Sequence, residues 1–187
     1  MTVRPDVDEH RGAPDTVVVA PLAQVAGDGG QRLADLVGRC SPGTLAARFH
    51  TAAAPQADRV VASLALHLAS RTQFGVVVDG VLAGCGGHVA AGPDRVEVAV
   101  LVADPWQGRG LGRRLLRHAL TDPGWRGREV VAHVRLDDER ALRVARGVLG
   151  EVAATVVGRR HDGTVELRAA VASRPLLRHP TEIEELP

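Results

Sequence analysis

The spacing of apolar residues changes along this chain, and the change predicts where helices give way to strands. Within residues 33–37 and again within 60–68, apolar residues recur three and four positions apart, which is the spacing of a buried helix face. A further helix start is predicted at Ser41–Pro42, where a capping Ser precedes a Pro in the first turn. After one short β-branched run at 16–19, the N-terminal part is therefore predicted to be helical.

From Phe74 onward, β-branched runs and turn residues predict strands instead. The turn Asp79-Gly80 joins two of them as a hairpin, and glycines at 84, 86 and 87 suggest a bulge or a close backbone approach in the second strand. Apolar spacing predicts helices at 110–120 and at 138–149, the latter ending at Gly150. The strands predicted in this part are 74–78, 81–90, 96–102, 130–134, 152–157 and 165–171.

The predicted order is one strand, two helical regions, three strands, and then a helix, a strand, a helix and two strands. This is a mixed α/β arrangement in a chain of 187 residues, a length typical of one domain. We place the domain at residues 16–172, with a flexible segment at 1–15 and a flexible, proline-containing tail at 173–187.

Composition argues against several classes of function. The chain has 23 basic and 22 acidic residues, two Trp, two Phe and no Tyr, which disfavours nucleic acid or an anionic membrane as a partner. Cys40 and Cys85 match no zinc or redox spacing, and no spacing of His, Cys, Asp and Glu predicts a metal site. We see no signal peptide and no apolar run of about 18 residues, so we expect a cytoplasmic protein.

The segment with the clearest chemistry lies between the strand at 96–102 and the helix at 110–120. Its glycines stand at 108, 110 and 112, and glycine lacks the Cβ atom that would keep an anion from the backbone. Amides at a helix N-terminus have no intrahelical partner, so this loop predicts a diphosphate site, with Arg109 and Arg113 adding charge. A nucleotide P-loop is excluded because the chain has no Lys, and a dinucleotide fingerprint because its third glycine position holds Arg113.

The pattern Gln-x-x-Gly-x-Gly, here Gln107, Gly110 and Gly112, resembles the acyl-CoA pyrophosphate motif of the GNAT acetyltransferases. The resemblance implies the GNAT fold, an α/β fold with a mixed central sheet of six to seven strands flanked by about four helices. It implies acetyl-CoA, or another acyl-CoA, as co-substrate. It assigns the pantetheine arm to backbone groups of Leu101, Val102 and Ala103. It assigns the pyrophosphate to Gln107, Gly108, Arg109, Gly110, Leu111, Gly112 and Arg113.

A second segment, residues 41–49, looks like a Ser-Pro-x-x-Thr/Ser-Leu-x-x-Arg-Phe pattern of GNAT domains in bacterial protein-lysine acetyltransferases. A capped helix accounts for the same residues equally well. The resemblance implies that this helix borders the acceptor cleft. It favours a protein lysine as acceptor over an amino acid or another small amine.

Acetyl transfer to an amine requires a base that removes a proton from the ammonium group. Glu97 is the candidate, because strand alternation places it on one face with Ala99 and Leu101. A Glu at this strand position also resembles the general base of the protein-lysine-acetylating members. The structural alternative is a solvated Glu at a strand end, and His88 and His133 are the fallback bases.

Two departures from the family pattern bear on activity. Many members use a Tyr to protonate the departing thiolate, and this chain has none, which leaves Cys85, water or bulk solvent for that step. Glu139 stands where the family often has an Asn that touches the cofactor. A carboxylate there is unfavourable beside phosphates unless it turns away or pairs with Arg140 or Arg143.

The resemblance therefore predicts an N-acetyltransferase that moves an acetyl group from acetyl-CoA to a primary amine by direct attack, with Glu97 as general base. The alternative is a catalytically degenerate GNAT domain that senses acyl-CoA or mediates protein contacts. The missing Tyr and the presence of Glu139 favour that alternative, whereas the intact loop at 107–112 and Glu97 oppose it. Expected partners are acyl-CoA and an amine acceptor, and the expected assembly is a monomer or a homodimer.

Overall fold

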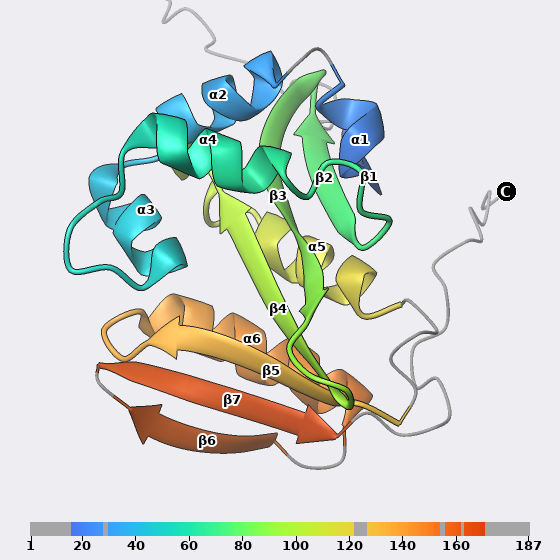
Figure 1. The fold of residues 1–187 in the computed structure, drawn as a ribbon, viewed down its shortest axis with the longest axis vertical. Helices are drawn as coiled ribbons and strands as arrows, with labels where there is room; N and C mark the ends of the chain where they lie inside the picture. The colour runs from blue at the N-terminus through green and yellow to red at the C-terminus, as the bar shows by residue number, and fades with distance from the viewer. Residues whose placement is uncertain (1–15, 28–29, 122–126, 154–155, 162, 171–187) are drawn as a thin grey trace, which may run out of the picture.

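The computed structural model describes residues 16–27, 30–121, 127–153, 156–161 and 163–170 (Figure 1). The segments predicted to be flexible, 1–15 and 173–187, lie outside these residues. Seven strands form one sheet in the order β1-β2-β3-β4-β5-β7-β6, antiparallel throughout except for the parallel pair β4 and β5. The strands are β1 (Val17–Pro21), β2 (Gln73–Val78), β3 (Val81–Ala90), β4 (Arg95–Val102), β5 (Glu129–Arg135), β6 (Val156–His161) and β7 (Thr164–Ala170).

Six α-helices occur among the described residues, one more than the five that the pattern predicted. Four of them precede β2, and the helix that was not predicted is the short one at Leu22–Val25. The cap predicted at Ser41 is confirmed, since its Oγ accepts from Thr44 N at 3.2 Å. The helices are α1 (Leu22–Val25), α2 (Gln31–Gly38), α3 (Pro42–Phe49), α4 (Ala57–Ala65), α5 (Leu111–Ala119) and α6 (Glu139–Val152).

The predicted end of the last helix was wrong. α6 continues through Gly150 to Val152, because Leu149 and Val152 belong to its buried face and extend the contact with the sheet. Packing of this face outweighs the roughly 1 kcal/mol by which a glycine weakens a helix. As a consequence β6 begins at Val156 rather than at residue 152.

The hairpin of β2 and β3 follows the prediction. Asp79 and Gly80 have φ angles of 48° and 81°, the left-handed values that a type I′ turn requires at both central positions. The register shifts between Val76 and Val77, which leaves Ala83 of β3 as the extra residue of a β-bulge. The glycine-rich second strand had suggested this irregularity.

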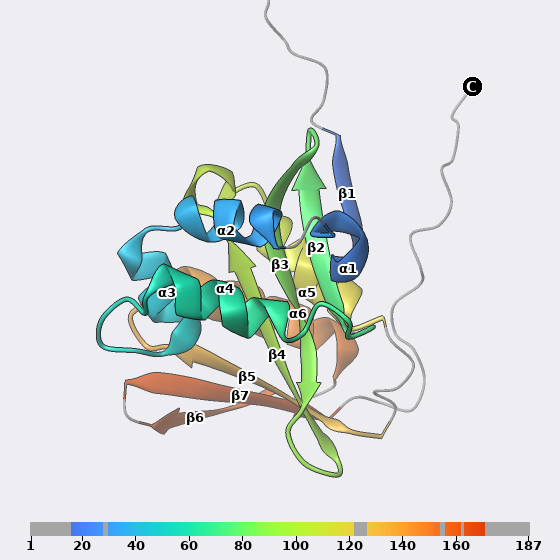
Figure 2. The ribbon, with the colours of Figure 1, turned by 45° about the horizontal axis from the view of Figure 1, so that its top comes forward.

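Helices cover both faces of the sheet (Figure 2). The first four helices lie on one face of the β1–β4 half, where Leu33 and Leu36 pack with Leu101 of β4. On the opposite face, α5 packs against β2 and β3 through Leu115, and α6 packs against β5 and β7 through Leu149. α6 covers one face of β5 and β7, and α3 contacts β5.

The parallel strands β4 and β5 separate along their length (Figure 1). They pair over three positions, from Arg95 opposite Glu129 to Glu97 opposite Val131. An ion pair of 2.9 Å between Arg95 Nε and Glu129 Oε2 joins the strands at the closed end. Beyond Glu97 the strands diverge toward their carboxyl ends, and the sheet is divided into a β1–β4 half and a β5–β7 half.

Candidate functional site

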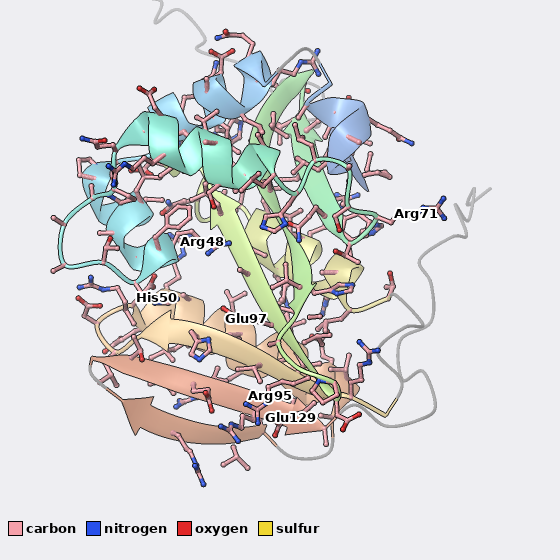
Figure 3. The ribbon with its side chains drawn as sticks, viewed as in Figure 1. Arg48, His50, Arg71, Arg95, Glu97 and Glu129 are labelled. Atoms are coloured by element: carbon pink, nitrogen blue, oxygen red, sulfur yellow. The ribbon has the colours of Figure 1, made fainter. Side chains whose placement is uncertain are left out.

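A cavity of about 790 Å³ lies between the diverging strands, and we call it the cleft. Residues 98–102 of β4 and 132–135 of β5 line its sides, and the loop before α5 lines one end. Figure 3 shows Arg48 and His50, at the end of α3, on the same opening as Glu97. Most residues predicted for the site line the cleft: Glu97, Leu101, Val102, Gln107, Gly108, Gly110, Leu111, Gly112 and Arg113. The other two predicted residues, Ala103 and Arg109, are not among the described lining residues.

The backbone of β4 presents alternate residues to the cleft. Ala103 N donates to Ala83 O at 3.0 Å, and the carbonyl of Leu101 lies against the facing glycine of β3. Because peptide groups alternate in direction along a strand, Val100 and Val102 turn theirs toward the cleft. Of the three predicted backbone positions, Val102 therefore faces the cleft, whereas Leu101 and Ala103 direct their peptide groups to β3. Val100 was not predicted.

α5 begins at the end of the cleft with its amides exposed to it. Gly108 and Gly110 have φ angles of 88° and 80°, in the left-handed region that favours glycine. The first helical hydrogen bond runs from Arg114 N to Gly110 O at 3.0 Å, so the amides of residues 111–113 have no intrahelical acceptor. These amides and the positive end of the helix dipole are the groups that the predicted anion site requires, and we call them the anion cradle.

Gln107 fastens this loop to α3. Its Nε2 lies 3.1 Å from Thr44 Oγ1, 3.0 Å from Val102 O and 3.2 Å from Asp104 Oδ1. Thr44 Oγ1 in turn donates to Asp104 Oδ1 at 2.7 Å. Burial opposes the charge of Asp104, but hydrogen bonds from Thr44 and Ser41 outweigh it and hold the pKa of Asp104 below its ordinary value. Gln107 thus positions the loop, and the Ser41–Thr44 cap belongs to the same network.

The arginines around the cradle are arranged differently from the prediction. Arg113 Nη2 forms a 2.8 Å ion pair with Glu151 Oε1 of α6, which Arg117 also contacts at 2.6 Å. The cation that lies against the loop is Arg140, from the first turn of α6. A Cβ atom placed on Gly108 would be 2.6 Å from Arg140 Nη2. The sequence had suggested Arg140 only as a partner for the carboxylate of Glu139.

Glu139 does not oppose an anion in the cleft. Its side chain is 84% exposed, and its Oε2 lies 3.5 Å from Arg143 Nη1 one turn further along α6. The carboxylate of Glu139 therefore both points into solvent and pairs with an arginine, the two arrangements that would make it compatible with a nearby phosphate. The helical rotation of 100° per residue brings Arg140 to the cleft in its place.

Glu97 lies where β4 and β5 part. Its Oε1 is 3.4 Å from His133 Nδ1 on β5, and His133 Nε2 is 3.3 Å from Glu166 Oε2 on β7. A carboxylate–imidazole–carboxylate chain therefore crosses three neighbouring strands. Hydrogen bonding to Arg168 holds the pKa of Glu166 below its ordinary value. The side chain of Glu97 is 37% exposed, so it meets both the cleft and His133.

The remaining candidates lie elsewhere. His88 is buried on β3, and it lines a smaller cavity rather than the cleft. Cys85 is buried beneath the first four helices, and burial raises the pKa of its thiol to about 11. Cys85 is not among the described residues that line the cleft, and it is therefore not positioned to protonate a thiolate there.

Among the residues that the structure describes, no group of three or more His, Cys, Asp or Glu could hold a metal ion. Within the same part of the chain, no helix combines the length and apolar character needed to cross a bilayer.

The separating strand pair, its outward peptide groups and the Gly-rich loop before a helix N-terminus together provide the parts that an acyl-CoA site requires. The chain belongs to the Acetyltransferase (GNAT) family, whose model matches residues 32–165. The chain spans about a third of the length of the curated relative that it matches.

Individual relatives agree with this assignment. The mycothiol acetyltransferase of Thermobifida fusca (strain YX) is 40% identical over 100 residues, which are 52% of this chain and 30% of that protein. The GNAT domain of S. lividans PAT superposes with a TM-score of 0.61 at 21% identity, over 86% of this chain and 92% of that chain. A spermidine N-acetyltransferase from Vibrio cholerae, in complex with CoA and spermine, gives a TM-score of 0.59 at 15% identity, over 84% and 96%. The two structures establish the fold.

Proposed function

We propose that this chain transfers an acetyl group from acetyl-CoA to a primary amine by direct attack, with Glu97 as general base. The observation that carries the proposal is the place of Glu97 at the closed end of the cleft whose other end is the anion cradle. A base and a phosphate site in one cavity suit a co-substrate with a reactive thioester at one end and phosphates at the other. The complex of the V. cholerae neighbour with CoA supports this co-substrate.

The two ends of acetyl-CoA would meet different parts of the cleft. The amides of residues 111–113 and the guanidinium of Arg140 are donors for the pyrophosphate. The outward peptide groups of Val100 and the N–H of Val102, whose carbonyl already accepts from Gln107, can pair with the amides of the pantetheine arm, as an added strand would. This arrangement would direct the acetyl group toward Glu97.

The chemistry then requires a neutral amine. Glu97 accepts a proton from the ammonium group, directly or through a water, and the freed nitrogen attacks the thioester carbonyl. The C–N bond forms, the attacking nitrogen gives its second proton to water, and the C–S bond breaks. CoA leaves as a thiolate that solvent protonates, since the chain has no Tyr and Cys85 is remote. His133, between Glu97 and Glu166, offers the abstracted proton a path to the exposed side of the sheet.

Two similarities bear on the identity of the acceptor, one in sequence and one in structure. The likeness of residues 41–49 to segments of protein-lysine acetyltransferases favours a protein lysine, and those residues form α3, a wall of the cleft. The V. cholerae neighbour holds spermine, a small polyamine. A primary amine is common to both, and a screen of lysine peptides and small amines would separate them.

Replacing Glu97 tests the proposal against its rival, a degenerate domain that binds acyl-CoA without turnover. Glu97→Gln preserves shape and removes the base, so acetyl transfer should fall about 100-fold while acetyl-CoA affinity stays unchanged. Glu139→Gln is the matched control, because that carboxylate is exposed and outside the cleft. Transfer that survives in Glu97→Gln would refute the base assignment. Tight acetyl-CoA binding without transfer in wild type, over the whole acceptor screen, would favour the rival.

A further inference from the structure

A second cavity adjoins the cleft at its closed end. It measures about 240 Å³ and lies among α4, β3 and β4. Arg48, Glu97 and Ala99 line both cavities, so these three side chains form the boundary between them. The second cavity is below the roughly 300–1,000 Å³ of pockets for drug-sized ligands, and it suits a group no larger than an amino acid.

Arg48 stands at this boundary without a partner for its charge. Its Nε is buried and has no hydrogen-bond acceptor among the described residues. No carboxylate in the same part of the chain forms an ion pair with its guanidinium, which stacks instead on Phe49, 5.0 Å from the ring centroid. Burial lowers the pKa of Arg48, although Cys85 and Glu97 act in the opposite direction. A partly desolvated cation of this kind is costly unless an anion comes to it.

The other cations of the cleft already have roles. Arg113 is paired with Glu151, and Arg135 contacts Asp137 at 2.6 Å. Arg140 lies against the anion cradle at the opposite end.

The other carboxylates of the cleft are also engaged. Asp104 accepts a hydrogen bond from Thr44, and Asp138 caps α6 by accepting from Ala141 N at 2.9 Å. Arg48 is thus the guanidinium near Glu97 that lacks a counter-ion among the described residues.

We infer that the acceptor amine carries a carboxylate, which Arg48 binds at the boundary of the two cavities while the amine meets Glu97. The inference rests on the proposed transfer function and names its substrate class: amino acids with a free α- or ω-amine. The charges agree with this class. Arg48 brings a cation, without a counter-ion among the described residues, beside the carboxylate of Glu97, which suits a substrate that carries both an amine and a carboxylate better than a polycation.

The test compares amines that differ in one group. Acetyl transfer from acetyl-CoA is measured for α-amino acids and ω-amino acids, each beside its own carboxamide, with spermidine and a lysine peptide included. A guanidinium–carboxylate contact that is lost in the amide corresponds to about a 10- to 100-fold difference in kcat/KM. We expect wild type to prefer the acids by this factor. A preference for the carboxamides, the polyamine or the peptide would overturn the inference.

Arg48→Gln should abolish the preference for acids, chiefly by raising KM for them, and leave the affinity for acetyl-CoA unchanged. Arg140→Gln is the matched control, since it removes the cation at the other end of the cleft. That variant should weaken acetyl-CoA and keep the preference for acids. If Arg48→Gln lowers transfer to acids and amides by the same factor, Arg48 acts through Glu97 and the substrate assignment is wrong. Arg48→Lys, which retains the charge, serves if the Gln variant does not fold.

A binding assay separates this inference from the proposed transfer. Thermal unfolding of the CoA-saturated protein is followed with each amino acid and its carboxamide. Stabilisation by the acid alone, lost in Arg48→Gln, would support the inference even if no acceptor were acetylated, and the transfer proposal would then fail by itself. Equal stabilisation by acid and amide, or by neither, would overturn the role of Arg48.

Discussion

The glycine at position 112 offers a test in which stability and binding should move in opposite directions. Gly112 is the second residue of α5, its φ is not left-handed, and an added Cβ would meet Val102 Cγ2 at 3.8 Å, an ordinary contact. Alanine stabilises a helix by about 0.5–1 kcal/mol over glycine. For a chain of this size that corresponds to roughly 1–4 °C in the unfolding temperature. We therefore expect Gly112→Ala to unfold at a higher temperature than wild type without ligand.

The same methyl group should weaken acetyl-CoA binding, because it stands at amides that form the anion cradle. Loss of one charge-assisted hydrogen bond costs about 1.5–3 kcal/mol, or about 10- to 100-fold in Kd. Calorimetric titration with acetyl-CoA measures the change. The control is Gly150→Ala, another helical glycine with open space around its Cβ position and no place in the cleft lining. It should raise stability without changing Kd, and Gly112→Ala with wild-type Kd would refute the cradle.

The remaining predictions concern the support of α5. Leu115 is fully buried on the face of α5 that packs against the sheet, so Leu115→Ala should lower the free energy of unfolding in urea by about 2–5 kcal/mol. A loss below about 1 kcal/mol would contradict this packing. Hydrogen bonds from Arg117 and Arg113 hold the pKa of Glu151 below its ordinary value. Its stabilisation is therefore present above the unfolded-state pKa and is lost as pH falls through the folded-state pKa. The deficit in stability of Glu151→Gln relative to wild type should be largest at pH 7 and shrink as the pH falls through the folded-state pKa, and a difference independent of pH would refute this pairing.

Much of this fold could be predicted from local pattern alone. The strand at 96–102 and the face on which Glu97 lies follow from period-2 alternation, which is set within the strand. The turn at Asp79 and Gly80 and the cap at Ser41 are local chemistry as well. The end of α6 was predicted wrongly because tertiary packing of Val152 outweighed the local signal of Gly150.

The site was less predictable, because its contacts depend on how distant strands are paired. The approach of His133 to Glu97 requires the short parallel register of β4 and β5, which no local pattern encodes. The outward direction of Val100 depends on which side of β4 pairs with β3. The position of Arg140 beside the loop depends on the rotation of α6 about its axis, which the sequence does not specify. Glu139 was a candidate only through its match to a family position, and its side chain is exposed.

The gap between β4 and β5 also affects how long the protein persists. Three paired positions hold the two halves of the sheet together along that edge, and a bound pantetheine arm would supply the missing strand partner. A ligand present at 100 times its Kd adds about 2.7 kcal/mol to the stability of the form that binds it. Stability of this order governs how often a chain opens to proteases. The cellular amount of this protein should therefore follow the supply of acetyl-CoA, with starved cells clearing it faster than fed cells at constant synthesis.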